Sequence, residues 1–183
     1  MAAKQKSRIA ASFPGGGAIA ALSRLRALLI AILLPALLPL AAQTSDRKAG
    51  VQHRGDEGMG FSHEKTTHHF RLTIDGGTIE VEADDPDDQQ SRDAIREHLD
   101  HIVVMFRRGD FDIPMFIHAT TPPGVPDMKR LKDRITYDAE PTQRGARVRI
   151  RSSDPQAIAA IHHFLRFQIR DHQTGDSTRI VRD

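Results

Sequence analysis

One pattern occurs twice in this chain, and it restricts the fold more than any other feature. Each copy has two short segments in which apolar and polar residues alternate, followed by a segment with apolar residues at helical spacing. The strand and Asp-Pro positions align Ile79, Val81 and Asp85-Pro86 with Val148, Ile150 and Asp154-Pro155, and the helix positions align Ile95, Leu99 and Val103 with Ile161, Leu165 and Ile169. This repetition predicts two β-hairpin–helix units, a weak internal duplication.

The first unit is expected at residues 67–109. The apolar residues that face the core from its two strands are expected to be Phe70, Leu72, Ile74, Ile79 and Val81. Asp75-Gly76-Gly77 between them is typical of a tight hairpin turn, which needs positive φ. Asp85-Pro86 predicts a helix N-cap followed by proline at the first helical position, and Gly109 predicts the end of that helix.

The second unit is expected at residues 134–174. Its apolar strand residues are Ile135, Tyr137, Val148 and Ile150. Asp154-Pro155 then predicts the start of the second helix. Together the units predict an α+β fold in which a four-stranded antiparallel sheet carries both helices on one face. The other face of the sheet should be exposed to solvent or should contact a partner. Cross-strand Arg–Glu pairing is the simpler explanation for its charges. Those charged residues are Arg71, Glu80, Glu82, Arg147 and Arg149.

Residues 110–133 link the units. They contain an apolar stretch that ends at His118, a Pro/Gly-rich segment, and at most one helical turn through Met128 to Leu131. A connection of this length in a compact domain is often functional. Its apolar residues also require that it packs on the body of the domain.

The N-terminal segment, residues 1–42, is typical of a secretory signal peptide. Five basic residues and no acidic one precede an apolar run, interrupted by Pro35 and Pro39, that ends in small residues. We expect cleavage near Ala42, and therefore a periplasmic or secreted protein whose only membrane contact is its export signal. Residues 43–66 are polar and without periodicity, which predicts a flexible leader, and residues 177–183 are expected to be a tail. A single domain is thus expected at 67–176.

The positive net charge of the chain comes from the export segment. Residues 1–42 hold 5 of the 26 Lys and Arg and none of the 24 Asp and Glu, which leaves a net charge of −3 on the remainder. A basic face for nucleic acid is therefore not expected. The chain has no Cys, which excludes disulfides, thiolate metal sites and a cysteine nucleophile.

Histidine is unusually abundant, and all of it follows the export segment. The ten histidines are His53, His63, His68, His69, His98, His101, His118, His162, His163 and His172. On the first helix His98, His101 and Met105 share one stripe at i, i+3 and i+7. Neutral imidazoles can bind zinc, copper or nickel, and a thioether favours Cu(I). Two histidines that flank a core and hydrogen-bond locally would explain the same pattern.

Other histidines could join such a site. His68 should face the core if Phe70 does, and residues of the leader could fold back onto it. His118 ends an apolar stretch on the central connection, where Met115 lies close by. His172 stands near the end of the second helix, where the helix dipole would favour a cationic ring. The candidate metal ligands are thus His98, His101, His118, His68, Met105 and Met115, with copper or zinc as the metal.

Several motifs together resemble a family of small exported bacterial proteins of unsettled function. They are Thr66-Thr-His-His-Phe-Arg-Leu, Asp75-Gly-Gly, Gly109-Asp-Phe, Pro122-Pro-Gly-Val and Phe164-Leu-Arg-Phe-Gln-Ile-Arg-Asp-His-Gln-Thr-Gly-Asp176. The resemblance covers residues 58–176 and implies a bacterial, periplasmic setting. Members of the family often carry the automatic label aspartate carbamoyltransferase. The chain lacks the Ser-x-Arg-Thr-Arg loop that binds carbamoyl phosphate, so no catalytic residue is carried over.

Three functions follow from these observations. The first is a non-enzymatic, exported domain that binds a transition metal such as copper. The second is a structural or interaction module that docks a periplasmic protein and whose histidines are incidental. The third is an enzyme that uses His118 with Asp110 or Asp112 as acid and base. No nucleophile elbow, zinc-protease pattern, P-loop or dinucleotide fingerprint accompanies the third.

Overall fold

The computed structural model describes residues 38–182. The chain separates into two units, residues 1–44 and 45–183, and the second unit is described here. The expected signal peptide therefore lies outside the described residues, except for its last few positions, which begin helix α2 (Leu38–Met59). Within the described part of the chain, no helix is both long enough and apolar enough to cross a membrane.

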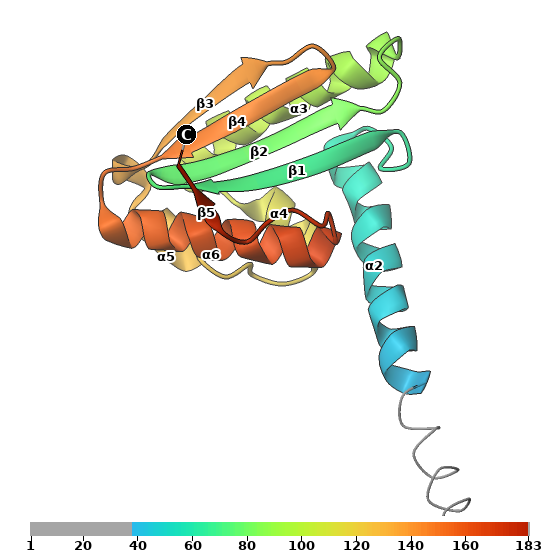
Figure 1. The fold of residues 1–183 in the computed structure, drawn as a ribbon, viewed down its shortest axis with the longest axis horizontal. Coiled ribbons are helices and arrows are strands. Elements are labelled where there is room, and N and C mark those ends of the chain that lie inside the picture. Colours follow the sequence, from blue (N-terminus) through green and yellow to red (C-terminus); the bar gives the residue numbers. More distant parts are fainter. Residues whose placement is uncertain (1–37, 183) are drawn as a thin grey trace, which may run out of the picture. The chain divides into compact units, whose positions relative to one another are not determined.

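A five-stranded sheet forms the centre of the domain (Figure 1). Its strands are β1 (Thr66–Thr73), β2 (Gly76–Ala83), β3 (Thr136–Pro141), β4 (Gly145–Arg151) and β5 (Ile180–Val181), in the order β3-β4-β2-β1-β5. The first four pair antiparallel, as expected, but β5 pairs parallel with β1. The α+β class is confirmed. The expectation of a purely antiparallel, four-stranded sheet is wrong, because the tail contributes β5.

The hairpin between β1 and β2 turns earlier than the sequence predicts. Leu72 pairs with Gly77 and Thr73 with Gly76, so the turn is formed by Ile74 and Asp75. Ile74 was expected on the core face, but it is 64% exposed because it lies in the turn and outside the strand. Gly76 adopts positive φ, and a Cβ there would lie 2.1 Å from the carbonyl oxygen of Ile150. Glycine is therefore required by close backbone approach.

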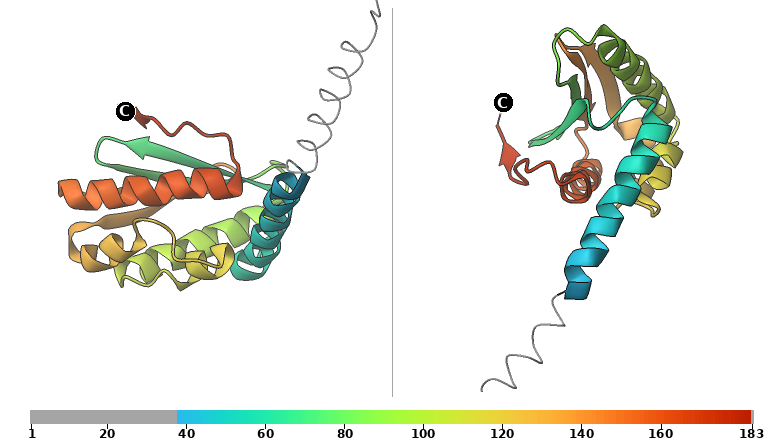
Figure 2. Two further views of the ribbon diagram at one scale, coloured as in Figure 1. Left: turned by 90° about the horizontal axis from the view of Figure 1, so that it is seen from below. Right: turned by 90° about the vertical axis from the view of Figure 1, so that its right-hand side faces the viewer.

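Two long helices, α3 (Gln89–Arg107) and α6 (Pro155–His172), cover the same face of the sheet (Figure 2). Phe106 of α3 meets Phe164 of α6 edge to face, with ring centroids 6.1 Å apart. The core consists of these helix faces and the inward residues of β1, β2, β3 and β4. Both helices on one face of the sheet is the arrangement expected from the sequence.

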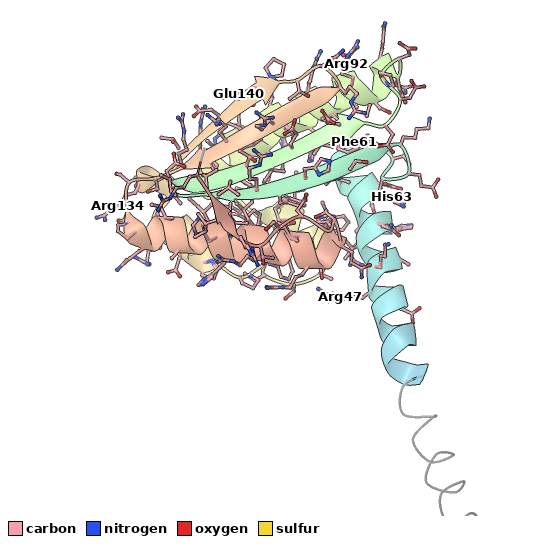
Figure 3. The ribbon with its side chains drawn as sticks, in the orientation of Figure 1. Arg47, Phe61, His63, Arg92, Arg134 and Glu140 are labelled. Carbon is pink, nitrogen blue, oxygen red and sulfur yellow. The ribbon has the colours of Figure 1, made fainter. Side chains whose placement is uncertain are left out.

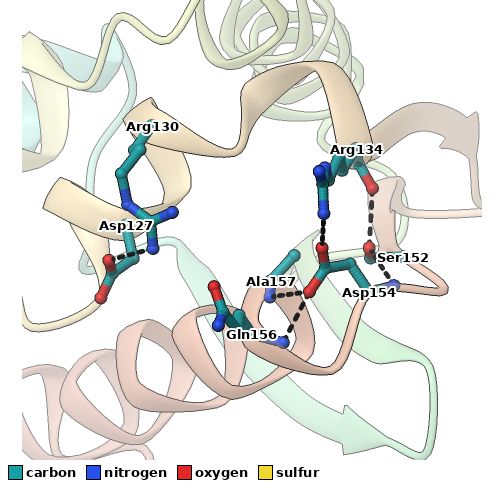
Figure 4. Close-up of polar contacts among 7 residues, drawn as sticks. All are labelled: Asp127, Arg130, Arg134, Ser152, Asp154, Gln156 and Ala157. Carbon is teal, nitrogen blue, oxygen red and sulfur yellow. Dashed lines mark hydrogen bonds and ion pairs between the residues drawn. The ribbon is translucent and has the colours of Figure 1, made fainter.

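The helix starts match the sequence prediction in one unit only. Asp154 caps α6 and accepts hydrogen bonds from the backbone N–H groups of Gln156 and Ala157, with Pro155 at the first position (Figure 4). Helix α3, in contrast, begins after Asp88, which accepts from Ser91. The prediction of the N-cap at Asp85 is therefore wrong, because the N-cap is Asp88, three residues further along the chain.

The two β-hairpin–helix units meet at the centre of the sheet, where β2 pairs with β4. Ile79 of β2 and Val148 of β4, which occupy equivalent positions in the two copies of the sequence pattern, are direct cross-strand partners. An equivalent pair that faces itself in an antiparallel ladder is typical of a local two-fold relation. Across the same seam Glu80 accepts a 2.9 Å hydrogen bond from Nε of Arg147, its cross-strand partner, on the open face.

The connection between the units is more helical than expected. It contains α4 (Asp112–His118), α5 (Val125–Arg130) and a 3-10 turn at Lys132–Arg134. Gly124 precedes α5 with a φ of +90°, and a Cβ there would lie 2.1 Å from the carbonyl oxygen of Ala160. The connection thus lies directly against the backbone of α6.

The segment 43–66, expected as a flexible leader, is helical through Met59. Val51 and Met59 on α2 are buried, at 3% and 9% exposure. The guanidinium of Arg54 donates from Nε to the carbonyl oxygen of Ile117 at 2.8 Å. The helix therefore packs on the domain through a few residues, although its mean composition is polar.

Candidate functional site

The candidate site is a small, partly open cavity, which we call the chamber. Its volume is about 60 Å³, and it lies between α3, α6, α4 and the inward faces of β1 and β2. Most of its lining is aliphatic or aromatic. The polar groups in that lining are His68, His98, His118, Gln168 and His172, and no Asp, Glu, Lys or Arg lines the chamber.

A second cavity, which we call the vestibule, adjoins the chamber. Its volume is about 170 Å³, and it lies between α2, β1 and the chain that follows α6. Met59, His68 and His172 line both cavities and therefore separate them. His63, which also lines the vestibule, lies shortly after the end of α2 (Figure 3). Its Nδ1 lies 2.8 Å from a carboxylate oxygen of Asp56. Two residues of the expected leader, Met59 and His63, thus line the same cavity as His68.

Aromatic contacts position three of the four histidines that line the chamber, His68, His98 and His172. His68 lies two residues before Phe70 on β1, and its ring stacks on His172 with centroids 5.4 Å apart and planes 9° apart. His98 of α3 meets Phe61 edge to face at 5.6 Å. Phe61 also stacks on His68 at 6.2 Å. Phe61 thus bridges the two histidine rings.

Burial keeps these three rings neutral. It lowers the pKa of His68 to about 4, and the nearby charges of His98, His69 and His63 lower it further. It also lowers the pKa of His98 to about 4, assisted by the charge of His101. The pKa of His172 is well below its usual value for the same reason. The expectation of a cationic His172 at the helix end is wrong, because loss of water outweighs the helix dipole.

These neutral rings have no hydrogen-bond partner in the protein. Within residues 38–182, the imidazoles of His68, His98 and His172 make ring contacts but no hydrogen bond to a protein group. The three side chains are half-buried, and their ring nitrogens are not among the fully buried polar atoms without a partner in this part of the chain. The ring nitrogens therefore remain available to an occupant of the cavities.

His118 has the opposite environment. It is 1% exposed, and both ring nitrogens are engaged: Nδ1 lies 2.5 Å from a carboxylate oxygen of Asp171, and Nε2 lies 2.8 Å from Oε1 of Gln168. The other oxygen of Asp171 accepts from Nε of Arg47 at 2.7 Å. A hydrogen-bonded series thus runs from Arg47 on α2 to Gln168 inside the chamber.

Gln168 ends this series with an unsatisfied group. Its side chain is 4% exposed, and its amide nitrogen has no hydrogen-bond partner in the described part of the chain. A buried amide N–H₂ without a partner is costly, by about 1–3 kcal/mol. Gln168 also belongs to the lining of the chamber.

The predicted metal ligands do not converge on one point. His101 is exposed on α3, and Met105 packs against the edge of the core. Met115 is half-buried on α4 and does not line the chamber. Among residues 38–182, no group of three or more His, Asp or Glu side chains is arranged to hold a metal ion. Of the predicted set, the chamber brings together only His68, His98 and His118.

The acid–base pair that the enzyme hypothesis named is not formed. The carboxylate of Asp110 accepts from the backbone N–H of Asp112 at 2.9 Å, which is a local turn contact. The carboxylate beside His118 is Asp171, 53 residues further along the chain. His118 therefore belongs to a pair that the sequence pattern did not reveal.

Sequence reasoning did not assign Gln168, Asp171 or His172 to the site. All three lie in the last turns of α6. Gln168 follows Ile161 by two helical turns and Phe164 by one, so it is an amide on the apolar stripe of the helix. A polar residue on such a stripe was the available signal.

Comparisons with family models, with curated proteins and with solved structures give no match to this chain. The functional argument therefore depends on the site itself.

Proposed function

We propose that this chain is an exported, non-enzymatic binding domain whose chamber holds a small, uncharged molecule. One observation carries the proposal: three neutral imidazoles and one amide nitrogen, all on residues that line an apolar chamber, have no hydrogen-bond partner among residues 38–182. Binding pockets commonly combine an apolar lining with a few polar groups that fix orientation. The pattern of export signal and histidine content supports the setting.

The composition of the chamber supports an uncharged ligand. No acidic or basic side chain lines it, so an ion would lose its hydration without a countercharge. The volume of about 60 Å³ is less than half of the roughly 150 Å³ cavity that accepts benzene in another protein. The ligand, or the part of it inside the chamber, is therefore smaller than benzene. A larger ligand would extend past Met59 into the vestibule.

Copper is a second candidate, and the electrostatics favour it. Metal binding requires deprotonated imidazole, and burial keeps His68, His98 and His172 in that form. The thioether of Met59 borders both cavities, and thioethers favour Cu(I). This revised ligand set replaces His101, Met105 and Met115 of the original hypothesis. Because no three His, Asp or Glu side chains among residues 38–182 are arranged to hold a metal ion, at most two of these histidines would contact the Cu(I) ion together.

A titration followed by methyl NMR tests the proposal. Cyclobutanone, a small uncharged ring with one acceptor oxygen, should shift the methyl signals of Ile102 and Ile113, which line the chamber. Ile113→Phe should fill the chamber and abolish the response. Ile158→Phe, at a half-buried position on α6 away from the chamber, is the matched control and should keep it.

A parallel anaerobic titration with Cu(I) separates the second candidate. Stoichiometric Cu(I) binding that His68→Gln and His98→Gln each weaken strongly would favour copper. Absence of a chamber response to either probe would refute both, and would leave the interaction module as the remaining hypothesis. That module would use the open face of the sheet, where Glu80 and Arg147 are already paired.

A further inference from the structure

We propose that the open face of the sheet binds a soluble anion that carries a phosphoryl group, between Arg71 of β1 and Arg149 of β4. The hydroxyl of Thr78, which lies between them on β2, is the third donor of the site. This inference goes beyond the proposed function. None of these three residues lines the chamber, so the test does not depend on what the chamber binds.

The site is built on one cross-strand row. Arg71 pairs with Thr78, and Thr78 pairs with Arg149, so the three residues follow one another across β1, β2 and β4. We call them the arginine row. Successive residues of a strand point to opposite faces, and Ile79 packs in the core, so the arginine row lies on the open face. Neighbouring strands lie about 4.8 Å apart, which places the Cα atoms of the two arginines roughly 10 Å apart.

Two donors of the arginine row have no partner in the protein. Arg71 is exposed and makes no hydrogen bond or ion pair with any of residues 38–182. The hydroxyl of Thr78 has no hydrogen-bond partner among these residues either, although the residue is only 9% exposed. Its oxygen is not among the fully buried polar atoms that lack a partner, so it can still be reached from the surface. The two groups together favour an acceptor that comes from outside the chain.

Two adjoining hollows border the arginine row. Their volumes are about 160 Å³ and about 30 Å³, and both are lined by Thr73, Thr78 and Arg149. The charged residues of the two linings are four arginines and two carboxylates, Arg71, Arg147, Arg149, Arg151, Asp75 and Glu80. The lining therefore has a net charge of +2, and an anion is its complementary occupant.

The two carboxylates of the lining do not neutralise the arginine row. A carboxylate oxygen of Glu80 lies 2.8 Å from Nη2 of Arg147, so Glu80 is paired with an arginine outside the row. Asp75 lies in the turn after β1 and accepts a 2.7 Å hydrogen bond from the hydroxyl of Thr73. The position between the two arginines of the row is occupied by the neutral Thr78.

Two further carboxylates lie on β3, at the outer side of the arginine row. Asp138 is the cross-strand partner of Arg149 and lies 3.0 Å from Nη2 of Arg151, and Glu140 lies 4.0 Å from Arg149. Neither lines the hollows. These charges would repel an anionic membrane that covered the whole face, whereas a small anion in solution contacts only the row. The site is therefore assigned to a soluble anion.

The arrangement of the donors favours a tetrahedral anion. The two guanidinium groups come from strands on either side of β2, and the hydroxyl of Thr78 lies between them. An occupant that meets all three donors must present oxygens in three directions. A phosphoryl group has three acceptor oxygens, whereas a carboxylate has two in one plane. Guanidinium groups also bind phosphate oxygens through paired hydrogen bonds.

A titration with inorganic phosphate, followed by NMR at neutral pH, tests the site. Phosphate should produce saturable shifts of the backbone amide of Thr78, and sodium chloride at the same ionic strength should not. Arg71→Gln should weaken phosphate binding about tenfold or more, because a hydrogen bond between charged groups is lost. Thr78→Val, which keeps the shape of the side chain, should weaken binding about threefold or more.

Two matched variants serve as controls. Arg108→Gln removes the charge of an exposed arginine that follows α3 and does not line the hollows. Thr142→Val removes a hydroxyl that is buried without a partner in the described part of the chain and that also lies outside the hollows. Both variants should bind phosphate as tightly as the wild type. Urea unfolding of all four variants verifies that each is folded.

The outcomes decide each part of the inference. Equal responses to phosphate and chloride, or phosphate binding that neither Arg71→Gln nor Thr78→Val weakens, overturn the site. Acetate that binds as tightly as phosphate overturns the assignment to a tetrahedral anion. Cosedimentation with phosphatidic acid vesicles that Arg71→Gln abolishes overturns the assignment to a soluble anion. Saturable phosphate binding that the two row variants weaken and the two controls preserve, without cosedimentation, supports the inference.

Discussion

Acid should destabilise this protein through its buried histidines, and the size of the effect follows from the pKa of His98. In an unfolded chain the imidazole has its ordinary pKa of 6.5, whereas burial lowers the pKa of His98 to about 4 in the fold. At pH 7.5 the ring is neutral in both states. As the pH falls below 6.5, His98 binds a proton in the unfolded chain but not in the folded protein. The free energy of unfolding therefore falls.

The loss continues until the folded protein also takes up the proton, near pH 4. At about 1.4 kcal/mol for each pKa unit, His98 alone accounts for about 3 kcal/mol between pH 7.5 and pH 4. His68 has the same pKa in the fold, but part of its shift comes from His98, so the two losses sum to less than twice that amount.

Urea unfolding at a series of pH values measures this effect, and variants isolate it from the titration of carboxylates. His98→Leu should lose about 3 kcal/mol less than the wild type between pH 7.5 and pH 4. Met105→Leu, on the same helix, changes packing without removing a titratable group and should run parallel to the wild type. A His98→Leu profile that is also parallel to the wild type would refute the reasoning.

Further predictions concern stability and can be checked by urea unfolding at pH 7. Gly124→Ala should cost several kcal/mol or prevent folding, because its Cβ would meet the Ala160 carbonyl at 2.1 Å; a loss below about 1 kcal/mol would contradict the contact. Asp154→Ala should cost about 1 kcal/mol through loss of the α6 cap, and Asp154→Ser should recover most of it. Tyr137→Phe should be neutral or stabilising by up to about 1 kcal/mol, because the hydroxyl is buried without a partner among the described residues and burial raises its pKa; marked destabilisation would reveal a partner.

Periodicity was sufficient to predict most of the scaffold. The alternation at Phe70, Leu72, Ile79 and Val81 gave two adjacent strands, and the Asp-Pro pair at 154–155 gave a helix start, because both depend on local chemistry. The errors occurred where tertiary contact decides. Strand β5 is two residues long and forms only because β1 offers a free edge. Helix α2 is polar on average and is identified by the burial of Val51 and Met59 against the body.

The candidate site was predictable only in part, for a related reason. His68 and His98 could be named from their positions beside apolar residues, and both line the chamber. The partners of His118 could not be found this way, because Asp171 and Gln168 lie 53 and 50 residues away. The sequence spacing also suggested that His98 and His101 form a pair of metal ligands. In the structure, however, His98 lines the chamber whereas His101 is exposed to solvent.

The near-duplication of the fold has a consequence for how a ligand would sit. When the two helices are aligned as the repeat aligns them, His98 is equivalent to Phe164, and both side chains line the same chamber. Two identical units would present the same wall twice, and a guest could then bind in two interchangeable orientations. With imidazole on one wall and phenyl on the other, that degeneracy is removed. The difference between the side chains at one equivalent pair of positions thus makes the chamber asymmetric, so that it can distinguish the two ends of a ligand.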